Sequence, residues 1–184
     1  MAKSAPASAA VVSTEPVLLE LFTSQGCSSC PPADRLAEKL AADPALVVIS
    51  RPVTYWDRLG WKDTLAREDN TQLQQAYARK GLAGANGVYT PQAVLNGREH
   101  LKGTDASEVN QRLDRMKSSG DGLVVPVKAS RHDDQLSITI GKGAGKANVV
   151  VVYFRQNQTV EVLKGENLGQ SLNYWHSVTD VQTV

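Results

Sequence analysis

The sequence predicts an α/β fold, in which a mixed sheet with flanking helices is followed by a small antiparallel β unit. Residues 16–22 and 45–53 are short apolar runs of the kind that form buried strands. Each run is followed by a segment in which apolar residues recur at helical spacing. Strands that alternate with helices imply a sheet that is at least partly parallel. After residue 122 apolar and polar residues alternate instead, which is typical of antiparallel strands.

Prolines, capping residues and glycines set the expected ends of the helices. Pro31 and Pro32 favour a first helical turn, where the missing N–H costs nothing. Asp105 and Glu108 have the spacing of a capping box, and Gly120 is expected to end the helix that they begin. In chain order the sequence predicts a strand at 16–22, a helix from 31, a strand at 45–53, a helix over 64–80, a strand at 93–95 and a helix between 105 and 120.

The second part of the chain is expected to contain strands and turns but no helix of note. Asp133-Asp134 and Asn157-Gln158 lie where hairpin turns would fall, and residues 141–145 look like a loop between strands. The subdomain that they form is small, so we expect it to pack on the preceding domain rather than to fold alone. The predicted division is a disordered tail at 1–14, an α/β domain over 15–121 and an antiparallel β subdomain over 122–184.

The composition and charge of the chain exclude two classes of partner. The 184 residues include 20 basic and 19 acidic side chains, so no charge surplus indicates a nucleic acid or an anionic membrane surface. No apolar run is long enough to cross a bilayer. Residues 1–10 are rich in Ala and Ser and lack the apolar core of a signal peptide, which fits either a cytosolic start or an exported chain whose signal has been removed.

The two cysteines, Cys27 and Cys30, form a Cys-x-x-Cys motif between the first strand and the first helix. The N-terminus of a helix offers N–H groups and a partial positive charge, which stabilise a thiolate. A thiolate at Cys27 would attack a substrate disulfide, and Cys30 would resolve the mixed disulfide. The motif therefore predicts thiol–disulfide exchange that needs no cofactor.

A structural staple and a metal site are the alternatives for this pair. A disulfide that closes a loop of about four residues contributes roughly 2 kcal/mol, which is less than a disulfide across a longer loop contributes. A closed zinc site needs four ligands, and the histidines at 100, 132 and 176 have no metal-site spacing. We therefore favour redox chemistry and predict no bound metal.

Four segments carry a resemblance to a known family: LELFTSQGCSSCPPAD at 19–34, YWDRLGWKD at 55–63, VYTPQAVLNG at 88–97 and GENLGQSLNY at 165–174. The chain resembles the thioredoxin superfamily, and it is most similar to a domain-of-unknown-function family of secreted, thioredoxin-like bacterial proteins. The resemblance implies a thioredoxin-like fold over 15–121 and export, to the periplasm. It implies nothing about the substrate. The chain departs from the family pattern at 51–54, where the usual His before the Tyr-Trp-Asp segment is absent.

The resemblance also implies supporting residues around the cysteines. In thioredoxin-like folds a cis-proline after a short residue faces the Cys-x-x-Cys pair, and Pro91 after Thr90 has this position. Such proteins often bury an acid beneath the disulfide, and Glu20 is the candidate here. Glu20 lies one residue further from Cys27 than usual, and a one-residue offset turns a strand side chain to the other face unless a bulge intervenes. The alternative for Glu20 is an exposed or salt-bridged side chain.

Gln25 and Trp56 are candidates for a substrate groove. The Gln25 amide lies in the turn before Cys27 and could hydrogen-bond a substrate chain, and the alternative is a solvated turn residue. Trp56 could line a groove beside the cysteines, although such aromatic side chains more often belong to the core.

These observations predict a thiol–disulfide oxidoreductase that acts on a protein or small-molecule dithiol or disulfide, together with an unknown redox partner. A non-enzymatic thioredoxin-like binding module and a redox sensor are the alternatives, because a fold does not determine a function. The three hypotheses differ in the reactivity of Cys27, which would be unreactive in a binding module and reactive without multiple turnover in a sensor.

Overall fold

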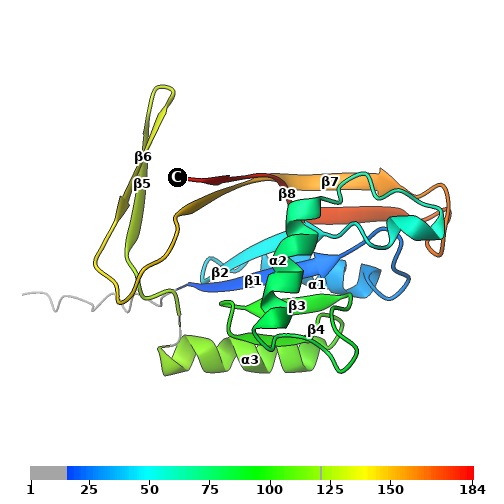
Figure 1. Cartoon of the computed structure of the whole chain (residues 1–184), viewed down its shortest axis with the longest axis horizontal. Coiled ribbons are helices and arrows are strands. Elements are labelled where there is room, and N and C mark those ends of the chain that lie inside the picture. The colour runs from blue at the N-terminus through cyan, green and yellow to red at the C-terminus, as the bar shows by residue number, and fades with distance from the viewer. Residues whose placement is uncertain (1–15, 121) are drawn as a thin grey trace, which may run out of the picture.

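The computed structural model describes residues 16–120 and 122–184, so the predicted disordered tail at 1–14 lies outside the described residues. The described chain has a mixed α/β architecture, with a six-stranded mixed sheet and a separate two-stranded antiparallel sheet (Figure 1). Its elements are β1 (Val17–Thr23), α1 (Pro31–Leu40), β2 (Leu46–Pro52), the short 3-10 helix η1 (Asp57–Leu59), α2 (Glu68–Arg79), β3 (Gln92–Leu95), β4 (Glu99–Lys102), α3 (Ala106–Ser119), β5 (Val127–His132), β6 (Gln135–Ile140), β7 (Val150–Glu161) and β8 (Ser171–Thr183).

The main sheet is partly parallel, as predicted, with the strand order β4-β3-β1-β2-β8-β7. β1 runs parallel to β2, and β2 runs parallel to β8. The pairs β1–β3, β3–β4 and β7–β8 are antiparallel. β1 is therefore an inner strand with a neighbour on each side, and its end leads directly to the cysteines.

Alternate residues of β1 face different layers of helices, because successive side chains of a strand point to opposite faces. Leu19 and Leu21 belong to a buried cluster that includes Ala33 of α1 and other residues of α1 and α3. Phe22 belongs to a second cluster, which includes Tyr77 of α2. Helices thus cover both faces of the sheet around β1, and Figure 1 shows α2 crossing in front of it.

The predicted helix ends at 105 and 120 are confirmed. The Asp105 carboxylate accepts a hydrogen bond from the N–H of Glu108 at 2.9 Å, and Gly120 has a positive φ of 72° at the C-cap of α3. The aspartate provides the N-cap half of a capping box, whereas the Glu108 carboxylate accepts a hydrogen bond from Arg112 at 3.0 Å; the glycine provides the expected C-terminal stop.

The second helix begins at Glu68, four residues after the predicted start at 64. The reason lies in Asp63, whose carboxylate accepts hydrogen bonds from the N–H groups of Leu65 and Ala66 at 2.8 and 3.0 Å. A side chain that satisfies these N–H groups locally holds the chain in a turn instead of a helix. The short strand β4, which the sequence analysis did not predict, pairs with β3 across the turn at Asn96-Gly97.

The turns of the second part are partly as predicted. Asp133-Asp134 joins β5 to β6, and residues 141–145 lie in the loop between β6 and β7. The predicted turn at Asn157-Gln158 is wrong, because both residues lie inside β7 and pair with β8. β7 is an edge strand whose residues are largely exposed, so polar side chains interrupt its apolar pattern without turning the chain.

The hairpin of β5 and β6 stands apart from the main sheet, whereas β7 and β8 extend it beside β2 (Figure 1). The division of the chain into domains at 121 and 122 stays a prediction. No helix in the described part of the chain is long and apolar enough to span a bilayer.

Candidate redox site

Cys27 and Cys30 are joined by a disulfide bond in the turn that leads from β1 into α1. Two backbone hydrogen bonds shape this turn, from Cys27 N–H to the carbonyl of Ser24 at 3.2 Å and from Cys30 N–H to the carbonyl of Cys27 at 3.1 Å. Cys30 is the N-cap of α1, and two prolines follow it in the first helical turn. The sequence thus places the pair at a helix N-terminus, as predicted.

The disulfide is covered by protein. Cys27 and Cys30 each have a relative exposure of 0 %, whereas Ser28 and Ser29 between them are exposed. The turn therefore presents its two serines to solvent and its two sulfur atoms to the interior.

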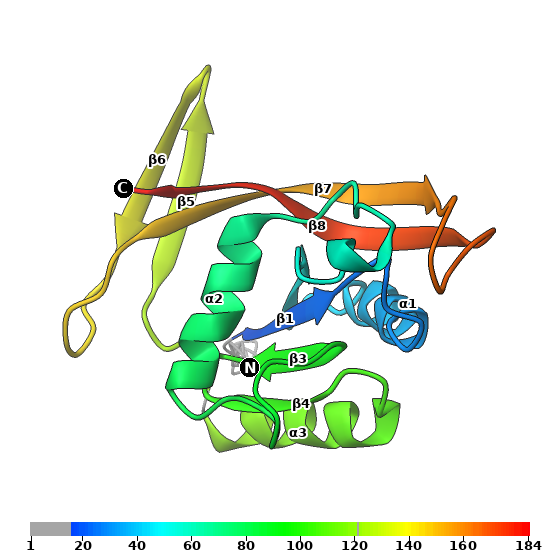
Figure 2. The ribbon, with the colours of Figure 1, turned by 45° about the vertical axis from the view of Figure 1, so that its right-hand side comes forward.

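A loop from the far end of the chain contacts the backbone of this turn. The loop at 163–170, hereafter the cover loop, joins β7 to β8 and lies at the same end of the sheet as the start of α1 (Figure 2). The Asn167 side chain, itself 1 % exposed, donates hydrogen bonds to the carbonyls of Gln25 and Cys27 at 2.9 and 3.0 Å. The Glu166 carboxylate accepts a hydrogen bond from Ser28 N–H at 3.1 Å, and hydrogen bonding to Ser28 lowers the pKa of Glu166. These contacts join residues that are 138 to 142 positions apart in the chain.

Gln25 holds the turn instead of facing solvent. Its side chain is fully buried, and its amide oxygen accepts hydrogen bonds from the Trp61 indole N–H at 2.9 Å and from Thr64 N–H at 3.2 Å. Its backbone N–H donates to the Asp63 carboxylate at 2.8 Å. The solvated turn residue considered as the alternative is therefore wrong, and the amide is occupied by the protein itself where a substrate contact was considered.

Thr90 and Pro91 form a cis peptide bond, as predicted. Trp56 lies beside them, because its indole N–H donates a hydrogen bond to the Thr90 hydroxyl at 2.8 Å. The same ring is partly buried and packs against a buried cluster that includes Phe22 and Val53, as the packing alternative for Trp56 expects, and its place in a substrate groove stays a prediction.

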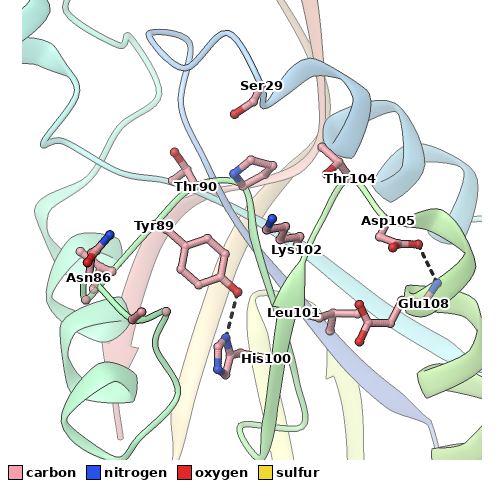
Figure 3. A pocket seen from close by; sticks show the side chains of 15 residues that line it. Ser29, Asn86, Tyr89, Thr90, His100, Leu101, Lys102, Thr104, Asp105 and Glu108 are labelled. Carbon is pink, nitrogen blue, oxygen red and sulfur yellow. Dashed lines mark hydrogen bonds between the residues drawn. The ribbon is translucent and has the colours of Figure 1, made fainter.

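A cavity of about 870 Å³ opens beside the Cys-x-x-Cys turn. Ser29 lines one end of it, and Thr90 and Pro91 line its wall, so the cavity joins the exposed side of the turn to the cis-proline (Figure 3). On the side of the cavity away from Ser29, the Tyr89 hydroxyl is hydrogen-bonded to Nδ1 of His100 at 2.9 Å (Figure 3). Neither Gln25 nor Trp56 is among its lining residues in the described part of the chain.

Glu20 is buried on the α2 side of the sheet. Its carboxylate pairs with the Arg51 guanidinium at 2.6 Å and accepts a hydrogen bond from the Tyr77 hydroxyl at 2.5 Å. Burial, followed by the charge of Glu20 and this hydrogen bond, raises the pKa of Tyr77. The salt-bridged alternative for Glu20 is therefore present, and a role of this acid in exchange stays a prediction.

A second buried acid, Asp34, lies on the other side of the sheet, in the first turn of α1. It is 4 % exposed, and neither of its carboxylate oxygens has a hydrogen-bond partner among the described residues. Burial raises its pKa to about 8, and the charge of Asp63 acts in the same direction. The Thr23 hydroxyl is near enough to lower this pKa, although its geometry falls short of a hydrogen bond.

Tyr174 of β8 is a further buried polar side chain near Asp34 and Asp63. Its side chain is fully buried, and its hydroxyl has no hydrogen-bond partner among the described residues. Burial raises its pKa, and the charges of Asp34 and Asp63 raise it further. No local pattern in the sequence indicates a role for these buried polar side chains, although all of them lie in the segments that carry the family resemblance: Asp34, Asp63, Asn167 and Tyr174.

No group of three or more His, Cys, Asp or Glu side chains within 16–120 and 122–184 is arranged to hold a metal ion.

Comparisons with known proteins give two matches. A family described as proteins of unknown function, DUF1223, matches residues 18–184. The crystal structure of protein AGR_C_4864 from Agrobacterium tumefaciens is similar to this chain, with 50% sequence identity and a TM-score of 0.79 over 91% of this chain and 72% of that one. A search of curated proteins finds no match. The family agrees with the domain-of-unknown-function resemblance of the sequence motifs.

Proposed function

We propose that this chain, which belongs to the DUF1223 family, is a thiol–disulfide oxidoreductase. Cys27 is the attacking cysteine and Cys30 is the resolving cysteine. The observation that carries the proposal is the disulfide between two cysteines in Cys-x-x-Cys spacing at the N-terminus of α1. A local disulfide in this position suits a pair that cycles between two redox states, because the partial positive charge at the N-terminus of a helix stabilises the thiolate of the reduced form.

The strand order supports a thioredoxin-like fold for this proposal. The order β4-β3-β1-β2, with β1 parallel to β2 and with β3 and β4 antiparallel, resembles the core of thioredoxin-like proteins. The cavity beside Ser29 and Pro91 offers a place for the substrate next to the turn. β7, β8 and the cover loop are additions to this core.

The reaction begins with the reduced pair. The Cys27 thiolate attacks one sulfur of a substrate disulfide, the substrate S–S bond breaks, and one substrate thiolate leaves. The Cys30 thiolate then attacks Cys27 Sγ, the bond between Cys27 and the substrate breaks, and the second substrate thiolate leaves. The substrate disulfide is reduced and the cysteine pair is oxidised, and the same steps in reverse oxidise a dithiol.

The burial of both cysteines favours a second candidate, a redox sensor or binding module. In an oxidoreductase the cover loop has to move away from Cys27 for a protein substrate to reach it. In a sensor the change between the dithiol and the disulfide would itself alter the contacts of Asn167 and Glu166 with the turn.

The reduction potential of the pair tests the proposal. We expect equilibration in glutathione buffers, with mass detection of alkylated thiols, to give a potential between roughly −270 and −120 mV. The Cys30→Ser variant should then trap a mixed disulfide on Cys27, whereas Cys27→Ser should trap none. A pair that stays oxidised below about −300 mV would identify a structural disulfide and overturn the proposal. Multiple turnover with a disulfide substrate separates the enzyme from the sensor.

The compartment follows from the same proposal. A disulfide persists in oxidising environments, so we propose that the chain works outside the cytoplasm, in the periplasm. The redox partner and the substrate would be found there.

A further inference from the structure

Asp34 lies in the first turn of the helix that Cys30 caps. It follows Cys30 by four residues, and its N–H donates a hydrogen bond to the Cys30 carbonyl at 3.1 Å. Residues four apart lie on the same face of a helix, and helical side chains lean toward the N-terminus. The Asp34 carboxyl therefore lies over the turn that Cys30 begins, and both side chains are buried there.

The surroundings of Asp34 leave its carboxyl available for a proton. Asp63 of the loop before α2, Tyr174 of β8, Thr23 of β1 and Arg35 of α1 are the groups that act on it. None of them supplies a hydrogen bond to Asp34, and neither carboxylate oxygen has a partner elsewhere among residues 16–120 and 122–184. A buried carboxylate without such bonds is destabilised relative to the neutral acid, so Asp34 takes up a proton readily.

The other two buried acids near the turn, Glu20 and Asp63, already have partners. Glu20 is paired with Arg51 on the α2 side of the sheet, whereas Thr23, three residues later in the alternation of β1, faces the α1 side with Asp34. The Asp63 carboxylate accepts hydrogen bonds from the N–H groups of Gln25, Leu65 and Ala66. Burial raises the pKa of Asp63, and these bonds, which hold the turn, act in the opposite direction.

We infer that Asp34 is the proton acceptor for the thiol of Cys30 when the mixed disulfide is resolved, an inference that rests on the proposed exchange function. The Asp34 carboxylate takes the proton from Cys30 Sγ–H, and the resulting thiolate attacks Cys27 Sγ. The bond between Cys27 and the substrate sulfur breaks, and the substrate leaves as a thiolate. When the pair is reduced again, Asp34 returns the proton to Cys30.

Mixing the reduced protein with glutathione disulfide tests this step directly. Samples quenched with acid at successive times are analysed by mass for the glutathione adduct of Cys27 and for the Cys27–Cys30 disulfide. We expect Asp34→Asn to accumulate the adduct and to slow its resolution about 100-fold near pH 7, within the range that general base catalysis contributes. The Asp34→Glu variant, which keeps the carboxyl, should restore part of the rate.

The pH dependence separates proton transfer from a structural effect. The wild-type resolution rate should rise with pH, be half-maximal near pH 8, where half of the Asp34 carboxyl groups are ionised, and level off above it. In Asp34→Asn the rate should continue to rise above about pH 9, because only ionisation of the thiol by solvent remains. A variant that was merely misfolded would be slow at every pH and would not converge on the wild type.

Two further measurements distinguish failure of the inference from failure of the proposed function. In the Cys30→Ser background, Asp34→Asn should change the rate of adduct formation by about twofold or less, because attack by Cys27 does not need Asp34. If the wild type forms no adduct, the exchange function fails. If the wild type exchanges and Asp34→Asn resolves the adduct at the same rate and with the same pH profile, only the inference on Asp34 is overturned. Asp114→Asn, an exposed substitution of the same kind on α3, is the matched control and should leave both steps unchanged.

Discussion

Three buried carboxyl groups lie in or near the segment that runs from β1 through the Cys-x-x-Cys turn into α1, and each has different partners. Glu20 is paired with Arg51 at 2.6 Å, and removing one partner of such a pair would leave the other charge buried and uncompensated. Burial raises the pKa of Asp63 as well, but hydrogen bonds from three backbone N–H groups oppose this rise. Asp34 has neither a cation in contact nor a hydrogen bond within the described residues, and its pKa rises as a result. The difference in partners, not in residue type, gives the three acids different roles.

The raised pKa of Asp34 predicts an unusual dependence of stability on pH. Its pKa is about 8 in the folded protein and near 4 in the unfolded chain, so the folded state binds more protons between these values. Asp34 therefore lowers the free energy of unfolding progressively as the pH rises from about 4 to 8. We expect Asp34→Asn to be more stable than the wild type by about 1–3 kcal/mol at pH 8 and equally stable near pH 4.

Urea unfolding of the oxidised protein at both pH values measures this difference. Asp114→Asn, exposed on α3, should show no pH-dependent gain. An Asp34→Asn variant that is less stable than the wild type at pH 8 would contradict the assignment of Asp34 as an uncompensated acid.

The cover loop couples the last hairpin to the Cys-x-x-Cys turn. Gly165 allows its course, because it has a positive φ of 83° and an added Cβ would lie 3.4 Å from Cβ of Trp61. Asn167 then reaches two carbonyls of the turn, and Glu166 reaches Ser28 N–H. The carboxylate of Glu166 also places a negative charge next to the turn, which opposes a thiolate at Cys27 while the loop is closed.

Opening of this loop should control the reactivity of Cys27. Asn167→Ala removes two hydrogen bonds to the turn and leaves their carbonyls without this donor, a loss of about 1–3 kcal/mol. We expect the reduced variant to be alkylated by iodoacetamide about tenfold faster than the wild type, since about 1.4 kcal/mol corresponds to tenfold in an opening equilibrium.

Mass measurement of alkylated Cys27 over time provides the test, with Asn157→Ala on the exposed edge strand β7 as the matched control. Equal alkylation rates in the wild type and Asn167→Ala would mean that the cover loop does not limit access to Cys27.

At the scale of the whole molecule, the last two strands complete the sheet that positions the site. β8 lies beside β2 and brings Tyr174 to the buried group around Asp34. Leu172 and Tyr174 of β8 form a buried cluster with Val162, against which Trp61 packs. The hairpin of β5 and β6 shares no strand pairing with this sheet. The region after residue 122 therefore contains one part that joins the main sheet and one part that stands beside it.

This arrangement predicts that the chain does not fold stably without β8. A variant that ends at Gly120 exposes the edge of β2 and the buried side chains that β8 covers, so we expect it to lack a cooperative thermal transition. Replacement of residues 127–140 by a short Gly-Ser linker should instead leave the transition within a few degrees of the wild type. The ends of that hairpin are adjacent, since Gly141 N–H bonds to the Pro126 carbonyl at 2.7 Å, so a short linker can join them.

Circular dichroism during heating distinguishes the two deletions. A cooperative transition in the chain that ends at Gly120 would support an independent domain over 15–121 and would contradict the structural role given to β8.

The sequence by itself determined the features that depend on short segments. The Cys-x-x-Cys turn, the prolines that begin α1, the capping box of α3 and the cis bond before Pro91 were all predictable. Each of them is specified by residues within a few positions of one another or by a family motif. Alternation along β1 likewise predicted that Glu20 points to the opposite face of the sheet from the usual buried acid. Glu20 lies on the α2 side, where it pairs with Arg51.

Only the tertiary structure decided what surrounds the cysteines. Asn167 contacts Gln25, and Tyr174 lies near Asp34, so residues up to about 140 positions apart in the chain meet around the turn. Local patterns cannot specify such contacts, because the position of β8 in the sheet depends on the packing of the whole chain. The same packing removes Asp34 from water and leaves its carboxyl without a partner among the described residues. An aspartate that the sequence shows only as part of the first turn of a helix thereby becomes the candidate acceptor of the proton from Cys30.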